Sequence, residues 1–210
     1  MTQIKICGLK TREAVLVAAE SGVDYIGFVF AQSKRQVTAE EVLKFAEGIQ
    51  TPKRVGVFVN EPFDSLLTVG DMACLDVFQL HGAETPEICS RLKRASGKQV
   101  WKAWQVRGNE QDLAIREYAG TIDACLLDTF LPGAAGGTGQ TFQWNEIERF
   151  RSLLPGVQLF VAGGLNSGNV GELLEKYKPD GVDVSSGVET NGVKDIEKMR
   201  LFIRKVRERD

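Results

Sequence analysis

The stretch QLFVAGGLNSGNVGELLEKYKPDGVDVSSG, residues 158–187, decides the fold class. It begins with an apolar run over 158–164 that ends in two glycines, and it closes with a second run over 181–186. Between the runs, apolar residues recur at i, i+3, i+4 and i+7 from Val170, which is the spacing of an amphipathic helix. Because two strands joined through a helix lie parallel, the stretch predicts neighbouring strands of a parallel sheet.

The same alternation continues along the whole chain. Helical spacing also occurs over 42–49 and 199–206, and eight β-rich apolar runs are separated by such segments. Eight strand–helix units predict an α/β protein, a compact (β/α)8 TIM barrel that forms a single domain over 1–210. An open doubly wound sheet of similar length is the alternative fold. The eight predicted strands cover 4–8, 24–30, 54–59, 76–82, 99–104, 123–128, 158–164 and 181–186.

The overall composition excludes several classes of protein. The 26 basic and 28 acidic residues give a net charge of −2, which argues against a surface built for nucleic acid or anionic membranes. Hydrophobic residues make up 43% of the chain, enough for a sizeable core and too many for disorder. No apolar run is long enough to span a bilayer, and the N-terminus lacks a signal-peptide pattern, so we expect a cytoplasmic protein.

Histidine and cysteine usage limits the possible chemistry. His81 is the only histidine, which excludes a metal site that needs two histidine ligands from one chain. The four cysteines contain no C-x-x-C pair, so neither a zinc ribbon nor a thioredoxin-like motif is expected. We expect all four to be free thiols. An enzyme with this composition must take its acid and base groups mainly from Asp, Glu, Lys, Tyr or Cys.

Glycines follow the last two predicted strands, where barrels commonly bind a phosphate group. In the barrel, both segments lie at the carboxyl ends of neighbouring strands, and glycine lets backbone N–H groups approach an anion closely. Tight turns with no ligand are the alternative interpretation. A third glycine-rich stretch over 132–139 follows the predicted sixth strand and suits a lid or a further phosphate contact. The candidate phosphate-binding residues are Gly137, Gly139, Gly163, Gly164, Ser185, Ser186 and Gly187.

Cys7 is the one thiol at the carboxyl end of a predicted barrel strand. Side chains alternate along a strand, so Cys7 and Lys5 share one face while Ile4 and Ile6 share the other. The isoleucines suit the helix side, which leaves Cys7 and Lys5 facing the barrel axis. A small core residue is the alternative role for this cysteine.

Five further polar side chains lie in predicted strands or in the loops that follow them. Asp128 closes the sixth strand as a candidate acid, with loop capping as the alternative. Asp183 lies between two valines and needs a specific partner there. Gln79 and His81 share the inward face of the fourth strand, and from the residues alone His81 ranks level with Cys7 as a base. Arg35, after the second strand, can bind a carboxylate in bidentate fashion or lie solvated.

Taken together, these motifs resemble the phosphoribosylanthranilate isomerase family of tryptophan biosynthesis. They occur in order over almost the whole chain. The first and last are distinctive singly, and the set is highly specific. The matching segments are KICG at 5–8, S-x-R at 33–35, QLHG at 79–82, LD at 127–128, GGTG at 136–139, AGGL at 162–165 and DVSSGVE at 183–189.

The resemblance implies an enzyme that uses no cofactor and no metal. Its reaction is the Amadori rearrangement of N-(5-phospho-β-D-ribosyl)anthranilate to 1-(2-carboxyphenylamino)-1-deoxy-D-ribulose 5-phosphate. By matching motif, Cys7 is the general base and Asp128 the general acid, Arg35 binds the anthranilate carboxylate, and Asp183 orients the amino group. Gln79 and His81 become substrate-side neighbours. The only expected partner is this small phosphosugar substrate, and neither nucleic acid nor a membrane is expected to bind. The protein is expected to be a monomer or a homodimer.

The implied mechanism needs a thiolate and a neutral carboxylic acid in one site. We therefore predict that Lys5, about 6–7 Å along the strand from Cys7, stabilises the thiolate. Two other functions stay open. A related aminoaldose-phosphate isomerase of histidine biosynthesis carries Asp in place of Cys7 and two similar half-barrels, and no internal repeat is visible here. A non-catalytic phosphosugar-binding barrel would need neither Cys7 nor Asp128.

Overall fold

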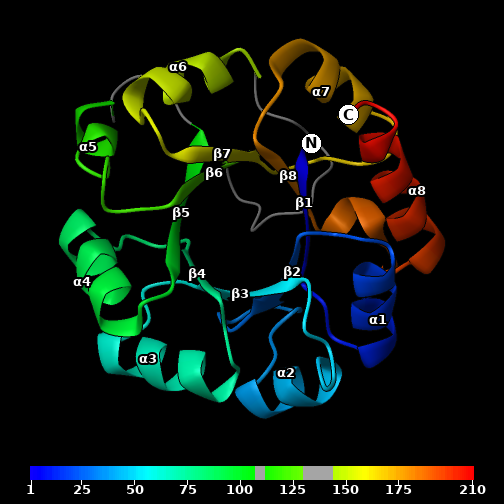
Figure 1. Ribbon diagram of the computed structural model, residues 1–210, viewed down its shortest axis with the longest axis horizontal. Helices are drawn as coiled ribbons and strands as arrows, with labels where there is room; N and C mark the ends of the chain where they lie inside the picture. The colour runs from blue at the N-terminus through cyan, green and yellow to red at the C-terminus, as the bar shows by residue number, and fades with distance from the viewer. Residues whose placement is uncertain (107–111, 130–143) are drawn as a thin grey trace.

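The protein is a closed eight-stranded parallel barrel, seen along its axis in Figure 1. The structure is a computed structural model, and it describes residues 1–106, 112–129 and 144–210. Each strand pairs with its neighbours in chain order, and β1 pairs with β8 to close the ring. Closure confirms the predicted barrel and rules out the open sheet. The strands are β1 (Gln3–Cys7), β2 (Tyr25–Val29), β3 (Lys53–Phe58), β4 (Val77–Leu80), β5 (Gln99–Val106), β6 (Ala124–Thr129), β7 (Gln158–Val161) and β8 (Gly181–Val184).

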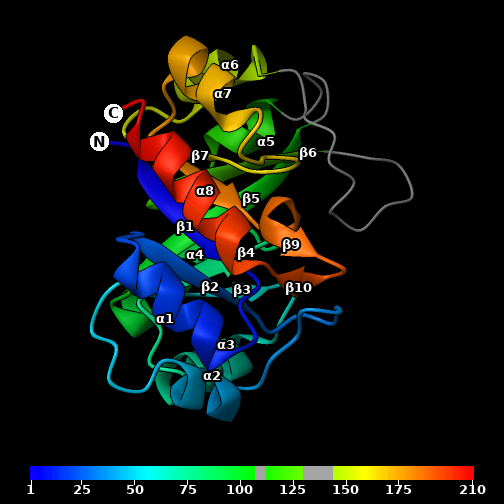
Figure 2. The same cartoon turned by 90° about the vertical axis from the view of Figure 1, so that its right-hand side faces the viewer.

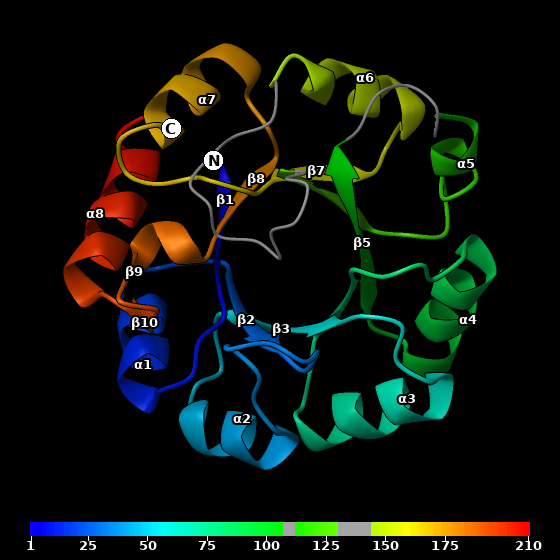
Figure 3. The ribbon, with the colours of Figure 1, turned by 180° about the vertical axis from the view of Figure 1, so that it is seen from behind.

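An outer ring of helices surrounds the barrel. The helices follow one another around it in chain order (Figure 3). Among the described residues, none of them combines the length and the apolar character that crossing a membrane would require. The helices are α1 (Arg12–Glu20), α2 (Ala39–Phe45), α3 (Phe63–Met72), α4 (Pro86–Ser96), α5 (Asp112–Arg116), α6 (Glu146–Leu153), α7 (Val170–Tyr177) and α8 (Ile196–Arg207).

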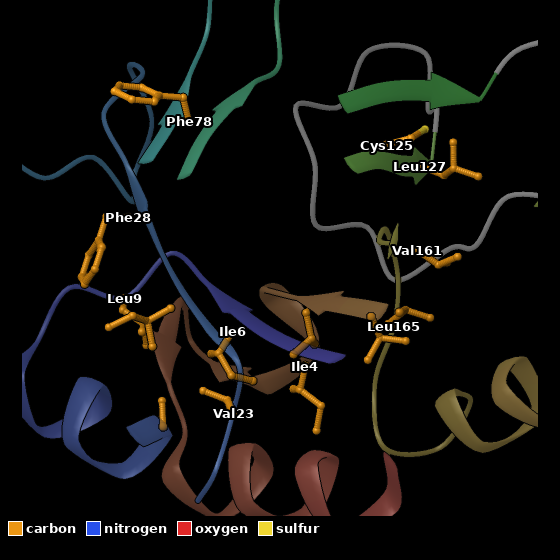
Figure 4. Packing of buried hydrophobic residues seen from close by; sticks show 14 of the residues in the cluster. Ile4, Ile6, Leu9, Val23, Phe28, Phe78, Cys125, Leu127, Val161 and Leu165 are labelled. Carbon is orange, nitrogen blue, oxygen red and sulfur yellow. The ribbon is translucent and has the colours of Figure 1, made fainter. Parts of the chain in front are cut away.

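The alternation of side chains along the strands divides the core into two parts. Outward side chains pack against the helices; Figure 4 shows Ile4 and Ile6 on the side of β1 that faces them. Cys125 belongs to this outer part together with Leu127, which lies two residues further along β6 and therefore on the same face. Inward side chains form a smaller cluster on the barrel axis, in which the rings of Trp101 and Phe160 are 4.5 Å apart. Hydrophobic burial on both faces is therefore what holds the parallel sheet.

Several strands and one helix end earlier than the sequence predicts. Strands β4, β7 and β8 stop at Leu80, Val161 and Val184, so the polar and glycine residues that follow are loop residues. Gly163 and Gly164 have φ of 74° and 67°, in the left-handed region that ends a strand. The apolar spacing over 42–49 continues past α2, which ends at residue 45. Apolar periodicity reports burial, and buried residues can continue into a turn.

The carboxyl ends of the strands lie at one end of the barrel, opposite the two chain termini. Figure 2 shows both termini at one end and a small hairpin at the other. This hairpin follows β8 and the short 3-10 turn η2 (Ser186–Val188). It pairs β9 (Glu189–Thr190) with β10 (Val193–Lys194), and Asn191 and Gly192 between them have φ of 53° and 79°. Positive φ at both positions is what a type I′ turn requires, and Asn-Gly adopts it readily.

Candidate active site

A cavity of about 330 Å³ opens at the carboxyl ends of the strands, and most of the predicted site residues line it. A second hollow, of about 730 Å³, lies beside the chain termini and is lined by none of them. Gly137 and Gly139, the remaining two predictions, lie outside the described residues. The predicted residues that line the first cavity are Cys7, Arg35, Gln79, His81, Asp128, Gly163, Gly164, Asp183, Ser185, Ser186 and Gly187.

Cys7 lies above a buried ion pair that joins the first and last strands. Lys5 and Asp183 are register partners between β1 and β8, and Lys5 Nζ lies 2.9 Å from Asp183 Oδ2. Lys5 is wholly buried and Asp183 is 8% exposed. The predicted inward direction of Lys5 and Cys7 is confirmed. The structure also provides the partner that the sequence demanded for Asp183.

Lys5 lowers the pKa of the Cys7 thiol, as predicted, but burial raises that pKa by more. Burial raises the pKa of the Cys7 thiol above its ordinary value, and the Lys5 ammonium, which acts to lower it, offsets only part of that rise. Asp183 adds a further upward influence because it is negative. Burial alone would lower the pKa of Lys5, but Asp183 and Cys7 together raise it, so Lys5 stays charged.

Gly27 makes room for Cys7, and the sequence argument did not single it out. The two residues are register partners between β1 and β2. A Cβ atom on Gly27 would lie 2.9 Å from Cys7 Sγ and 3.1 Å from Lys5 Cε, closer than side chains pack. A glycine inside an apolar strand was the available signal, because it marks close approach by another group.

His81 lies beside Asp128, with Nε2 3.8 Å from Oδ2. The pKa of His81 falls to about 4, mainly because its half-buried ring is desolvated and also because Lys102 and Lys5 are nearby. The imidazole is therefore neutral near pH 7, and 3.8 Å is too long for a hydrogen bond. His81 thus keeps a polar, uncharged edge beside the carboxyl group of Asp128.

A buried ion pair behind the cavity holds the loop that carries His81. Lys102 Nζ lies 3.3 Å from Glu84 Oε2, and both side chains are 3% exposed. Glu84 also accepts hydrogen bonds from the backbone N–H groups of Gly82 and Asn60, at 2.9 and 2.8 Å. Sequence reasoning missed this network because Lys102 is on the outward face of β5.

Arg35 reaches the cavity but already binds a carboxylate of the protein. Its Nε and Nη2 donate to Glu189 Oε1 and Oε2 at 2.7 and 2.8 Å. Burial would raise the pKa of Glu189, but Arg35 and Lys194 outweigh it and hold that pKa at about 2. Glu189 lies inside the DVSSGVE motif, and sequence reasoning gave it no role. Gly8, with φ of 77°, leaves space for the Arg35 side chain, since a Cβ atom there would lie only 2.5 Å from Arg35 Cδ.

The candidate phosphate residues come together from the loops after β7 and β8. Gly163 and Gly164 follow β7, and Ser185 leads into η2, which contains Ser186 and Gly187. A side chain on Gly187 would collide with the backbone carbonyl of the β7 loop, so the two loops can pack this closely only with glycine there. The sequence predicted this juxtaposition correctly.

Two buried polar atoms on the cavity wall have no hydrogen-bond partner within the described chain. They are Gln79 Oε1 and Asp183 Oδ1, on side chains that are 2% and 8% exposed. Buried acceptors are rarely left unpaired, so both are suited to a ligand that donates hydrogen bonds. In the same described ranges, no cluster of three or more His, Cys, Asp or Glu side chains could hold a metal ion.

Sequence comparison identifies a family for this chain. Residues 4–205 match the family model of N-(5'phosphoribosyl)anthranilate (PRA) isomerase. The N-(5'-phosphoribosyl)anthranilate isomerase of Brevibacillus brevis is 44% identical over 210 residues, which cover 99% of this chain and 94% of that protein. The enzyme of the same name from Bacillus subtilis is 38% identical over 200 residues, 95% of this chain and 92% of that one.

Solved structures give the same result. The phosphoribosyl anthranilate isomerase of Thermotoga maritima superposes with a TM-score of 0.88 at 36% identity, and the match covers 99% of this chain and 100% of that one. A phosphoribosyl anthranilate isomerase in complex with reduced 1-(o-carboxyphenylamino)-1-deoxyribulose 5-phosphate superposes with a TM-score of 0.84 at 34% identity and the same coverage. The chain therefore belongs to the phosphoribosylanthranilate isomerase family.

Proposed function

We propose that the protein catalyses the Amadori rearrangement of N-(5-phospho-β-D-ribosyl)anthranilate in tryptophan biosynthesis. The observation that carries the proposal is the placement of Cys7 and Asp128 on one cavity, from strands three positions apart around the barrel. A thiol and a carboxyl group on separated strands can reach a sugar from two sides. Simple binding of a phosphosugar requires neither group at these positions.

In the first step, Asp128 donates a proton to the ribose ring oxygen. The C1–O bond breaks, and the nitrogen lone pair forms a C1=N bond, which gives a protonated Schiff base. This cation acidifies the hydrogen on C2. Cys7, as the thiolate, removes that proton, which gives an enolamine. The enolamine takes up a proton at C1 and loses the proton of its C2 hydroxyl, which leaves the ketone. Each proton transfer is of the kind that a positioned side chain accelerates by about 10²–10⁴-fold.

The remaining side chains bind and orient the substrate. Arg35 binds the anthranilate carboxylate, for which a planar guanidinium is well suited. Asp183 Oδ1, which has no partner in the described chain, accepts from the substrate amino group, and Gln79 Oε1 accepts from a sugar hydroxyl. Neutral His81 contacts the substrate beside Asp128.

The phosphate group binds at the loops after β7 and β8. The backbone N–H groups of Gly163, Gly164 and Gly187, with Ser185 and Ser186, supply neutral donors for it. Gly137 and Gly139, outside the described residues, remain predicted contacts. The single-domain organisation, the cytoplasmic location and the choice between monomer and homodimer also remain predictions.

The direct test follows the loss of phosphoribosylanthranilate fluorescence with the wild type, Cys7→Ser and Asp128→Asn. We expect each variant to lose activity by several orders of magnitude, while a control substitution of the exposed thiol, Cys74→Ser, keeps it. Full activity in both site variants would refute the mechanism. Turnover of the aminoaldose phosphate of histidine biosynthesis instead would favour the related isomerase, and binding without turnover would indicate a non-catalytic barrel.

A further inference from the structure

The hairpin after β8 carries two buried charged side chains to which the proposed mechanism gives no role. Glu189 on β9 and Lys194 on β10 are register partners, and each side chain is 5% exposed. Their charged atoms lie 2.7 Å apart. Charged groups buried to this extent are retained only with specific partners, so their contacts indicate what they are for.

These contacts connect two parts of the substrate cavity. Glu189 holds the Nε and Nη2 edge of Arg35, at 2.7 and 2.8 Å. Lys194 Nζ donates to Glu189 Oε1 at 2.7 Å, and to the carbonyl oxygen and Oγ of Ser185 at 2.9 and 3.3 Å. Arg35 is the candidate carboxylate-binding group, and Ser185 begins the candidate phosphate loop. One charged chain of contacts therefore joins the candidate carboxylate-binding group to the candidate phosphate loop.

The bidentate contact leaves Arg35 able to bind a second carboxylate. A guanidinium has five N–H donors, and Glu189 uses the edge formed by Nε and Nη2. The end-on edge, formed by Nη1 and the second hydrogen of Nη2, makes no hydrogen bond within the described chain. Two cations and one anion also leave a net positive charge, which favours an anionic ligand.

We propose that Glu189 and Lys194 are positioning residues, which act through Arg35 and Ser185. Glu189 fixes the plane of the Arg35 guanidinium so that its end-on edge meets the substrate carboxylate. Lys194 fixes Glu189 and the phosphate loop together, so both ends of the substrate are bound at a set separation. This inference rests on the role proposed above for Arg35.

The hairpin backbone is held by contacts that do not involve these two side chains. Lys198 Nζ donates to the carbonyl oxygen of Glu189 at 2.9 Å, and Thr190 Oγ1 donates to Asp195 Oδ2 at 2.6 Å. The backbone N–H of Asp195 also donates to the carbonyl oxygen of Val188 at 2.9 Å. Substitutions at Glu189 and Lys194 can therefore change the positioning of Arg35 while the hairpin remains folded.

The experiment compares steady-state kinetics of Glu189→Gln, Lys194→Met and Arg35→Met with Lys176→Met, a matched change in a pair that is 59% exposed. An interaction made equally in the ground and transition states affects KM and leaves kcat nearly unchanged. Loss of one charge-assisted contact is commonly worth about tenfold, so we expect Glu189→Gln to raise KM by about tenfold or more. Lys176→Met should change neither constant. Thermal melting confirms that each variant folds, and Glu189→Asp and Lys194→Arg replace any that does not.

The double variant Arg35→Met/Glu189→Gln separates positioning from a general structural effect. If Glu189 acts through Arg35, the double variant has the KM of Arg35→Met alone. Inorganic phosphate, tested as a competitive inhibitor, should bind more weakly to Lys194→Met and unchanged to Glu189→Gln. Lys194→Arg should recover part of that loss.

The outcomes distinguish the inference from the proposed function. An unchanged KM in Arg35→Met would refute the carboxylate-binding role of Arg35 itself. A raised KM in Arg35→Met with an unchanged or lowered KM in Glu189→Gln would overturn the inference alone. Additive effects in the double variant would also overturn it, because they would mean that Glu189 acts independently of Arg35.

Discussion

Lys5 Nζ lies 2.9 Å from Asp183 Oδ2, beneath Cys7 and buried between the first and last strands of the barrel. The two charges affect the Cys7 thiol in opposite directions, since the cation favours the thiolate and the anion disfavours it. The pair is thus a local control on the basicity of Cys7. Removing the charge of Lys5 and removing that of Asp183 should therefore shift the pKa of the thiol in opposite directions.

We predict that Lys5→Met raises the pKa of the Cys7 thiol further, because it removes the largest influence that opposes burial. Asp183→Asn should lower that pKa. The pH dependence of iodoacetamide alkylation measures both, read at the Cys7 peptide by mass spectrometry because Cys74 is exposed and also reacts. If the thiol pKa is the same in Lys5→Met and the wild type, Lys5 has no role in activating Cys7.

His81 is the only histidine, so its titration can be read from a single imidazole resonance by NMR. We expect a midpoint near pH 4, because burial, Lys102 and Lys5 all lower the pKa. The folded-state pKa is below the unfolded value of about 6.5, so the unfolded chain binds this proton more tightly. The free energy of unfolding should therefore fall as pH drops from about 6.5 toward 4. His81→Asn should flatten that part of the stability curve, and a midpoint near 6.5 would show that the surroundings of His81 do not desolvate its ring.

The buried pair behind His81 predicts a large loss of stability when one partner is removed. Lys102→Met leaves Glu84 charged and buried, and breaking such a pair costs about 3–5 kcal/mol. The double variant Lys102→Met/Glu84→Gln removes both charges and should recover most of this loss. Urea denaturation measures both variants. A Lys102→Met variant with wild-type stability would indicate that water reaches Glu84.

Gly27 predicts a steric effect on catalysis. In Gly27→Ala the new Cβ would lie 2.9 Å from Cys7 Sγ, so the thiol or the strand must move. Overpacking of this kind costs about 1–3 kcal/mol of stability, and we expect kcat to fall because the base is displaced. The matched control is Gly171→Ala in α7, whose nearest neighbour, Arg209 Nε, is 3.6 Å from the new Cβ. The control should keep full activity. A wild-type kcat in Gly27→Ala would show that the site accommodates the added methyl group without displacing Cys7.

Local patterns along the chain were sufficient for the barrel and for most of the cavity wall. Alternating periods of two and 3.6 residues are properties of consecutive residues, and in a parallel barrel every strand end faces the same side. The inward direction of Cys7 and the meeting of the glycine loops after β7 and β8 therefore followed from strand position alone. The strand ends were less accurate. Strands β4, β7 and β8 end earlier than predicted, because polar residues that line a cavity continue the spacing of the strand, whereas β5 and β6 run on to Val106 and Thr129.

Pairings between distant residues were decided by the tertiary structure. Arg35 and Glu189 are 154 positions apart, and Lys5 and Asp183 are 178 apart, so no local period connects either pair. The closure of β8 onto β1 brings Asp183 opposite Lys5, and the hairpin beyond β8 carries Glu189 to Arg35. The pKa of Cys7 depends on the same closure, since burial and charge act through space rather than along the chain. Residue types and their spacing thus identify the chemical groups of this site, while their ionisation and their free hydrogen-bonding edges follow only from three-dimensional packing.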